Sequence, residues 1–91
     1  MREPIFNGQF KRDFRKVKKR GYDMEKMREI IALLTTDAPL PERCKDHALK
    51  GRWVTYRDVH IAPDWILIYK KVGDDQIIFA RTGTHSDLFA L

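Results

Sequence analysis

The sequence predicts an α+β fold in which two N-terminal helices pack on one mostly antiparallel sheet. Apolar residues recur at helical spacing through the first half of the chain, whereas the second half contains three segments rich in β-branched and aromatic residues. The connections between those three segments are short, which makes sequential strands antiparallel neighbours. A chain of 91 residues has room for one hydrophobic core, so we expect a single domain over residues 1–91.

The first predicted helix is amphipathic and strongly basic. Phe10, Phe14 and Val17 form its apolar stripe, and lysine and arginine fill most of the remaining positions. Asn7 is a typical N-cap residue, and Gly21 is a typical residue for the end of a helix. We therefore expect a helix between these two positions.

A second helix is expected directly after Asp23, which can cap its start. Apolar residues from Met24 to Leu34 recur three and four positions apart and predict one buried face. Two prolines in the segment 35–41 end the helical half, because proline lacks the N–H donor that a helix needs.

Three strands are predicted in the second half, at 52–61, 65–72 and 76–82, where β-branched and aromatic residues are frequent. Turn-forming residues separate these strands at 62–64 and 73–75. The sheet is therefore expected to be a meander of at least three strands.

The two ends of the chain carry further signals. The segment 6–9 with the residues before it is a candidate edge strand. Thr84 and Asp87 have the spacing of a capping box, which predicts a short helix or turn over 84–89.

Positive charge exceeds negative charge by five, and the isoelectric point near 9.6 indicates an anionic partner such as nucleic acid, a membrane or an acidic protein. The segment 11–20 carries seven basic residues, and Asp13 is its only acid. Such a run is either a solvated helix face or a surface that contacts phosphates. We expect Lys16, Lys18 and Lys19 to bind RNA phosphates.

Other features indicate a soluble, cytoplasmic protein without membrane association. No uninterrupted apolar run is longer than Trp65 to Tyr69, which is far shorter than the ~20 residues of a transmembrane helix, and the first residues do not open a signal peptide. Cys44 is the only cysteine and cannot form an internal disulfide, which fits a reducing compartment.

Three histidines in the second half, His47, His60 and His85, are the main candidates for chemistry. Strand pairing could bring them together with Asp64 and Arg81, which lie near the ends of predicted strands. Imidazole accepts and donates protons near neutral pH, and arginine holds a phosphate with a fixed charge. These groups suit RNA cleavage through the RNA's own 2′-hydroxyl, with one side chain as base, a second as acid and a cation that stabilises the pentavalent phosphorus.

Other interpretations of these residues are open at this point. A single histidine in a strand is more often a partly buried polar residue than a catalyst, because a catalytic site needs several groups in mutual geometry. Cys44 and His47 have the two-residue gap of a zinc knuckle, but a second cysteine is missing. The carboxylates of the second half form no motif that predicts a two-metal nuclease. Trp65 is expected to stack on a base, and Phe89 is either a core residue or a second stacking surface.

Four blocks of residues in the second half, followed by Leu88-Phe89, occur in a characteristic order. They are Lys45-Asp46-His47-Ala48-Leu49, Tyr56-Arg57-Asp58-Val59-His60-Ile61, Pro63-Asp64-Trp65-Ile66-Leu67-Ile68-Tyr69 and Arg81-Thr82-Gly83-Thr84-His85. Together these blocks closely resemble the YafQ branch of the RelE-like bacterial toxins. The N-terminal helices agree with that family only in pattern.

The resemblance implies the RelE-like fold, with two helices on a curved sheet, and the activity of a ribosome-dependent mRNA endonuclease of a type II toxin–antitoxin system. It also implies partners: the ribosome, with its RNA and the mRNA in the A site, and a small acidic antitoxin through which the complex would bind operator DNA. No cofactor or metal is expected. Carried over by position, the functional set of the family falls on His47, His60, Asp64, Trp65, Arg81, His85 and Phe89.

Within this set we expect Arg81 to stabilise the phosphate and His85 to act as general acid. His60 or Asp64 would be the base, and His47 would orient or assist. The alternative function is a non-catalytic RNA- or DNA-binding module, for which the basic helix and the aromatic residues would suffice. A small zinc protein is a further alternative.

Overall fold

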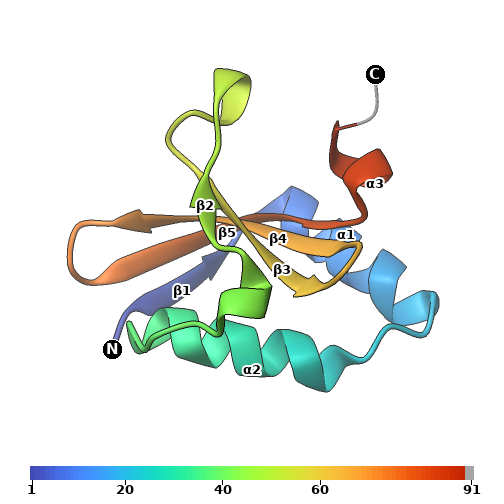
Figure 1. Ribbon diagram of the computed structural model, residues 1–91, viewed down its shortest axis with the longest axis horizontal. Helices are drawn as coiled ribbons and strands as arrows, with labels where there is room; N and C mark the ends of the chain where they lie inside the picture. The colour runs from blue at the N-terminus through green and yellow to red at the C-terminus, as the bar shows by residue number, and fades with distance from the viewer. Residues whose placement is uncertain (90–91) are drawn as a thin grey trace.

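A computed structural model describes residues 1–89 and contains one five-stranded sheet with helices on both of its faces (Figure 1). In chain order, the elements are β1 (Glu3–Phe6), α1 (Gly8–Lys19), α2 (Met24–Thr35), β2 (His47–Ala48), β3 (Arg57–Ala62), β4 (Trp65–Val72), β5 (Gln76–Gly83) and α3 (His85–Phe89), with short 3₁₀ helices at Glu42–Cys44 and Gly51–Trp53. The strand order is β1-β5-β4-β3-β2; β1 runs parallel to β5, and the other pairs are antiparallel. This arrangement confirms the predicted α+β fold.

The N-terminal helices begin and end where the sequence predicts. Asn7 caps α1, since its side chain accepts a hydrogen bond from the Phe10 N–H at 2.8 Å. Gly21 follows α1 with a φ of 86°, a left-handed conformation that glycine adopts without a steric penalty. Asp23 caps α2 by accepting from the Glu25 N–H at 3.1 Å. Local capping chemistry therefore sets both helix starts.

The main hydrophobic core lies between α1, α2 and one face of the sheet, which we call the helix face. Phe10 and Val17 of α1 and Met27 and Leu34 of α2 are almost inaccessible to solvent. The sheet contributes Val59, Ile61, Trp65, Leu67, Tyr69, Ile77 and Phe79. The alternation of side chains along β3, β4 and β5 directs these residues to the same side.

A smaller apolar cluster covers part of the opposite face of the sheet, which we call the open face. It contains Ile66, Ile68, Ala80 and Leu88, the last of which belongs to α3. In Figure 1, α2 runs below the sheet, whereas α3 and the loop after β2 stand above it. Because these segments cover the open face only in part, His60 and Arg81 keep some exposure to solvent.

The predicted strand at 52–61 is wrong over its first five residues. Gly51–Trp53 forms a 3₁₀ helix followed by a turn, so β3 begins only at Arg57. Gly51 has a φ of 67°, and the Tyr56 N–H donates to the Trp53 carbonyl at 2.8 Å. The rings of Trp53 and Tyr56 also pack edge to face, with centroids 5.2 Å apart. These local contacts outweigh the β propensity of the aromatic residues.

The remaining strand predictions need smaller corrections. β4 agrees with its predicted range, and β5 extends one residue further, to Gly83. β1 ends at Phe6, so residues 7–9, which the prediction included in an edge strand, instead cap and begin α1. The two residues of β2 were not predicted, because so short a strand has no visible alternation.

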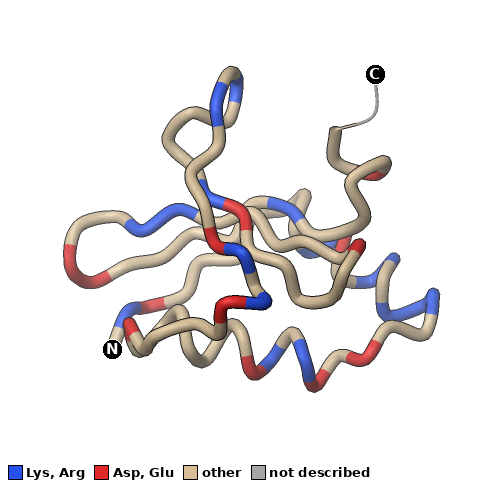
Figure 2. The backbone as a smooth tube through the Cα atoms, in the orientation of Figure 1, with Lys and Arg blue, Asp and Glu red and all other residues tan. Residues whose placement is uncertain are grey.

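Charged side chains are unevenly distributed over the fold. Figure 2 shows lysine and arginine gathered along the second half of α1 and at its end.

Within residues 1–89, none of the helices combines the length and the apolar character that a membrane span requires.

Candidate active site

One row of side chains crosses the sheet on its open face. His47 of β2 pairs with Asp58 of β3, Asp58 pairs with Ile68 of β4, and Ile68 pairs with Arg81 of β5. Residues that pair directly across strands point to the same face of a sheet. Strand pairing therefore aligns four segments that are far apart in the sequence.

A second row lies beside the first and leads to α3. His60 of β3 pairs with Ile66, and Ile66 pairs with Gly83 at the end of β5. α3 begins two residues after Gly83, so its first residue, His85, lies at the end of this row. The rings of His60 and His85 lie side by side, with centroids 5.4 Å apart. The structure thus confirms the prediction that these two histidines meet.

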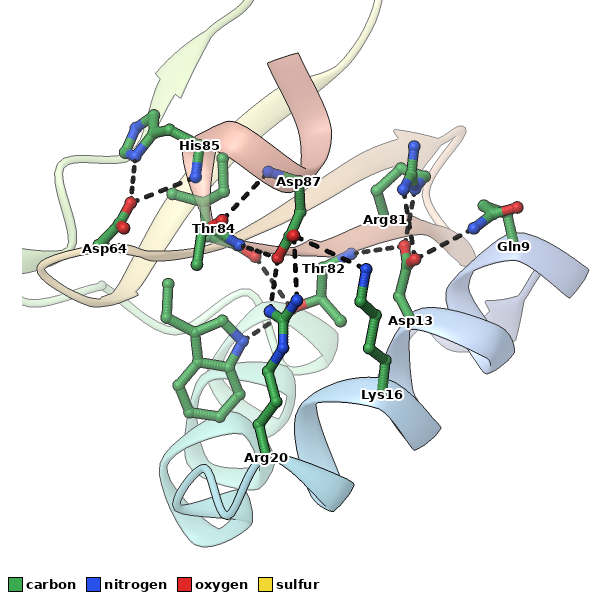
Figure 3. A network of polar contacts seen from close by, with 12 residues as sticks. Gln9, Asp13, Lys16, Arg20, Asp64, Arg81, Thr82, Thr84, His85 and Asp87 are labelled. Carbon is green, nitrogen blue, oxygen red and sulfur yellow. Dashed lines mark hydrogen bonds and ion pairs between the residues drawn. The ribbon is translucent and has the colours of Figure 1, made fainter. Parts of the chain in front are cut away.

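Asp64 holds His85 through two contacts (Figure 3). Its Oδ1 accepts from the His85 backbone N–H at 3.2 Å and lies 2.9 Å from the ring Nδ1. The hydrogen bonds from His85 keep the pKa of Asp64 below its usual value, so the carboxylate acts as acceptor. Nδ1 is then the protonated nitrogen of this pair, and Nε2 is left for another partner. More than half of each side chain is exposed, so a substrate can reach this pair.

The predicted capping box fixes the start of α3. The Thr84 N–H donates to Asp87 Oδ2 at 2.9 Å, and the Asp87 N–H donates to Thr84 Oγ1 at 3.1 Å. Arg20, at the end of α1, donates to both oxygens of Asp87 at 2.7 and 3.1 Å, and Lys16 Nζ lies 3.7 Å away. The hydrogen bonds from Arg20, and then those from Thr84, keep the pKa of Asp87 well below its usual value. α3, which carries His85, is therefore tied to α1 (Figure 3).

Gly83 permits this close approach between β5 and α3. A Cβ atom at position 83 would lie 2.9 Å from Asp87 Oδ2 and 3.0 Å from Asp87 Cβ. Any larger residue here would push Asp87 away and move α3 with it.

Asp58 is a site residue that sequence analysis missed. It is 3% exposed, and its Oδ1 has no hydrogen-bond partner among residues 1–89, although His47 Nδ1 lies 3.1 Å away. That nitrogen is nearer to the Lys45 carbonyl oxygen, at 2.8 Å, so its hydrogen bond goes there. Burial raises the pKa of Asp58, and positive charge on His47, His60 or His85 lowers it. A buried carboxylate thus lies within the electrostatic reach of all three imidazoles.

The sequence contained a signal for this carboxylate. Asp58 stands two residues before His60, and the period of a strand directs both to the same face. His60 itself is half-buried, and its Nδ1 has no hydrogen-bond partner among the described residues. Two neighbouring polar atoms of β3 are therefore buried without partners, which is unusual in a protein interior.

Arg81 does not join the histidines, contrary to the expectation that these side chains meet. Its Nε donates to Asp13 Oδ2 at 2.7 Å and its Nη2 donates to Asp13 Oδ1 at 3.3 Å. The guanidinium is thereby held toward α1, and β4 separates Arg81 from Asp58 in the cross-sheet row. Its side chain is 23% exposed, so it lies at the border of the open face.

The two aromatic residues expected to contact RNA have different surroundings. Trp65 is 3% exposed and belongs to the main core, where its indole N–H donates to Thr82 Oγ1 at 2.9 Å. A ring in this position offers no face to a base, so the structure does not support the stacking expected of Trp65. Phe89 is partly exposed, and its ring centroid lies 6.2 Å from that of His85. Phe89 therefore borders the histidines.

The basic residues expected to bind phosphates lie on the surface of α1. Lys18 and Lys19 are exposed, and within residues 1–89 neither forms an ion pair. Lys16 keeps 58% of its side chain exposed despite its contact with Asp87. Through Asp87, Lys16 reaches α3, the helix that carries His85.

The zinc alternative does not fit this geometry. Cys44 is 1% exposed and packs in the main core on the helix face, whereas His47 and His60 line the open face. Burial also raises the pKa of the Cys44 thiol, which disfavours the thiolate that zinc prefers. In the described part of the chain, no group of three or more His, Cys, Asp or Glu side chains is arranged to hold a metal ion.

Known proteins resemble this chain over nearly its whole length. A family model described as "Bacterial toxin of type II toxin-antitoxin system, YafQ" matches residues 2–90. The mRNA interferase toxin YafQ of Escherichia coli K12 is 46% identical over 89 residues, which cover 97% of this chain and 96% of that protein. A chain in a crystal structure of the E. coli DinJ–YafQ complex is 46% identical, with a TM-score of 0.88 and coverage of 98% and 99% of the two chains. A crystal structure of a metal-bound toxin from Helicobacter pylori is 32% identical, with a TM-score of 0.90 and coverage of 98% and 100%.

Proposed function

Since this chain belongs to the YafQ family of bacterial toxins of type II toxin–antitoxin systems, we propose that it is an endoribonuclease that cleaves mRNA in the ribosomal A site through attack by the RNA's own 2′-hydroxyl. One observation carries the proposal: His60 and His85 lie side by side on an accessible face, beside a buried carboxylate. Two imidazoles in contact can supply both the base and the acid that this reaction needs.

His85 is the general acid in this mechanism. Asp64 accepts the hydrogen bond from Nδ1 and thereby fixes the orientation of the ring. In the cationic form that a general acid requires, Nε2 also carries a proton, and this proton passes to the departing 5′ oxygen of the RNA. This arrangement commits Asp64 to His85, so Asp64 is a positioning residue and the role of base falls to His60.

His60 removes the proton from the 2′-hydroxyl and becomes positively charged. Asp58 lies next to it on the same face of β3, and its negative charge stabilises the imidazolium that forms. His47 stands across from Asp58 and adds a second positive group when protonated. The cost of burying Asp58 thus has a functional reason, because the carboxylate supports charge that develops during the reaction.

Arg81 supplies the positive charge that cleavage requires, and His60 and His85 supply the proton transfers. A bound cation is therefore not needed for any step of this mechanism. A chelator of transition metals that leaves Mg²⁺ in the buffer, and thus leaves ribosomes assembled, should not slow cleavage. If the chelator abolishes cleavage and added metal restores it, the histidines act as ligands rather than as acid and base.

The ribosome would provide the alignment that this small chain cannot impose on a flexible mRNA. Positioning of reacting groups can lower a barrier by ~7 to 11 kcal/mol. Lys18 and Lys19, exposed and without ion-pair partners among residues 1–89, would dock on phosphates of ribosomal RNA. Charge reversal at these lysines should weaken docking, and the effect should shrink as salt increases.

The antitoxin is proposed to be an acidic protein that covers the basic face of α1, and the toxin–antitoxin complex is proposed to bind operator DNA through the antitoxin. A relative of this chain forms a complex with DinJ. On this chain, a hollow of about 410 Å³ lined by Phe6, Phe10, Lys11, Phe14 and Arg15 offers apolar contacts beside positive charge. Association should be fast and salt-dependent. An association rate that does not vary with ionic strength would show that apolar contacts dominate the encounter.

The decisive experiment compares cleavage of one mRNA free in solution and bound in a programmed ribosome. Cleavage should occur only on the ribosome and should leave a cyclic phosphate or a 3′-phosphate. Equal rates would reject ribosome dependence, and a 3′-hydroxyl at the cut would reject attack by the 2′-hydroxyl. A nucleic-acid-binding module, the alternative function, would bind RNA without cutting it, and substitution of all three histidines would leave its binding unchanged.

A further inference from the structure

Asp13 is a buried carboxylate in the middle of the most basic segment of the chain. It is 6% exposed, although the segment 11–20 contains no other acid. Burial of a carboxylate is costly unless charged or hydrogen-bonding partners surround it. All the partners of Asp13 come from two elements, α1 itself and β5 (Figure 3).

One function of Asp13 is to accept a hydrogen bond from a backbone N–H at the edge of β5. β1 pairs with β5 only from Gln76 to Phe79, so within residues 1–89 no strand neighbours this edge of β5 beyond Phe79. Asp13 Oδ2 accepts the Thr82 N–H at 3.2 Å and thus takes the place of a strand carbonyl. This contact ties α1 to the sheet.

Asp13 also holds one edge of the Arg81 guanidinium. Oδ2 accepts from Nε at 2.7 Å, and Oδ1 accepts from Nη2 at 3.3 Å and from Gln9 Nε2 at 3.1 Å. A guanidinium carries five N–H donors, and this contact uses two of them. The remaining three donors lie on the far side of a rigid, planar group and are suited to a phosphate.

We infer that Asp13 is a positioning residue for RNA cleavage, which fixes the guanidinium of Arg81 so that its free N–H donors face the phosphate on the open face. The inference rests on the proposed function, in which Arg81 stabilises the phosphate. Without Asp13, the long side chain of Arg81 samples many rotamers, and its donors lose the fixed geometry that catalysis requires.

A double-mutant cycle on the full chain tests this inference, with single-turnover cleavage on programmed ribosomes as the readout. Arg81→Ala should slow cleavage by about 10² to 10³-fold, as expected for loss of a transition-state donor. Asp13→Asn should slow the chemical step by about 10 to 10²-fold with little change in the half-saturating ribosome concentration. In the Arg81→Ala background, Asp13→Asn should have no further effect. Gln9→Ala, which removes another contact of Asp13, is the matched control and should cleave at the normal rate.

Chemical rescue supplies a readout that a merely structural role would not change. Millimolar guanidinium should restore part of the activity of Arg81→Ala, because Asp13 can bind the free ion with its two carboxylate oxygens. Methylammonium should not do so, since it lacks the planar pair of donors. Rescue should be absent in the double variant. If Asp13→Asn does not fold, Asp13→Glu takes its place: it keeps the charge but moves the carboxylate, so it should slow cleavage when Arg81 is present and reduce guanidinium rescue in the Arg81→Ala background.

The outcomes separate the inference from the function on which it rests. Normal cleavage by Arg81→Ala would contradict the phosphate role of Arg81. Slow cleavage by Arg81→Ala with normal cleavage by folded Asp13→Asn would overturn the inference alone. Equal slowing by Asp13→Asn in both backgrounds, or failure of guanidinium rescue, would also overturn it and leave Asp13 as a contact that only holds α1 on the sheet.

Discussion

Polar groups are buried on both faces of the sheet, but only those on the helix face are fully paired. Asp13 accepts four hydrogen bonds, and Thr82 donates its hydroxyl to the Ile66 carbonyl while it accepts from Trp65. On the open face, Asp58 Oδ1 and His60 Nδ1 are buried without hydrogen-bond partners among residues 1–89.

This difference indicates that the helix face stabilises the fold, and on the proposed function the open face carries the chemistry. Paired polar groups in a dry interior contribute to stability, whereas an unpaired one costs about 1 to 3 kcal/mol. Proteins retain this loss of stability at sites where the unpaired group acts on a substrate. Substitutions on the helix face should therefore change stability first, and substitutions on the open face should change cleavage first.

The largest expected effect comes from the histidines of the open face. Single His60→Ala and His85→Ala variants should cleave ribosome-bound mRNA about 10² to 10⁴-fold more slowly, because each loses one proton-transfer group. Circular dichroism and thermal unfolding should be close to those of the unmodified chain. Normal cleavage by both variants would reject the histidine mechanism and leave the open face without a catalytic role.

The opposite pattern is expected on the helix face. Leu34→Ala should lower the free energy of unfolding by about 2 to 5 kcal/mol, because it opens a cavity in the main core. The cleavage rate per folded molecule should not change under conditions where the variant stays folded. Urea unfolding and single-turnover cleavage measure the two quantities, and a catalytic defect in the folded variant would show that the two faces are coupled.

Asp87 connects the two faces, and its removal should affect both. Asp87→Ala removes the capping box of α3 and the contact with Arg20, so it should cost about 0.5 to 2 kcal/mol of stability. Cleavage should also slow, because α3 no longer holds His85 in place. The wild-type carboxylate has a lowered pKa, so its contribution to stability is present above about pH 4 and is lost as the pH falls below the ordinary carboxyl pKa. The variant should therefore lose its stability defect in acid.

One substitution on the open face should change stability in the opposite direction. Asp58→Asn removes a buried charge and should stabilise the fold by about 0.5 to 2 kcal/mol at neutral pH while it slows cleavage. Because burial raises the pKa of Asp58 above the ordinary value of an aspartate, the wild-type carboxyl favours folding only in its protonated form. The difference between the two proteins should be small in acid and grow as the pH rises through that raised pKa. A variant that is less stable at every pH would show that Asp58 supports the fold.

Local chemistry made much of the fold predictable. Asn7 and Asp23 cap the helices that the apolar periods indicate, and Thr84 with Asp87 caps α3, because capping depends on residues three positions apart or fewer. β4 and β5 also follow directly from residue type. The first predicted strand was too long because contacts between Trp53 and Tyr56 overcame β propensity, and that competition depends on the loop as a whole.

For the candidate site, the sequence indicated the histidines and the meeting of His60 with His85, but it did not indicate the rest of the geometry. The types and order of His47, His60, Asp64 and His85 led to the proposed chemistry, since side-chain identity fixes what a group can donate or accept. Strand register determined that Asp58 lies among the histidines, and the early end of β1 determined that Asp13 binds β5 and Arg81. The tertiary structure also placed Trp65 in the core rather than against RNA. Burial and pairing across strands arise from contacts between distant segments, so only the folded chain decides them.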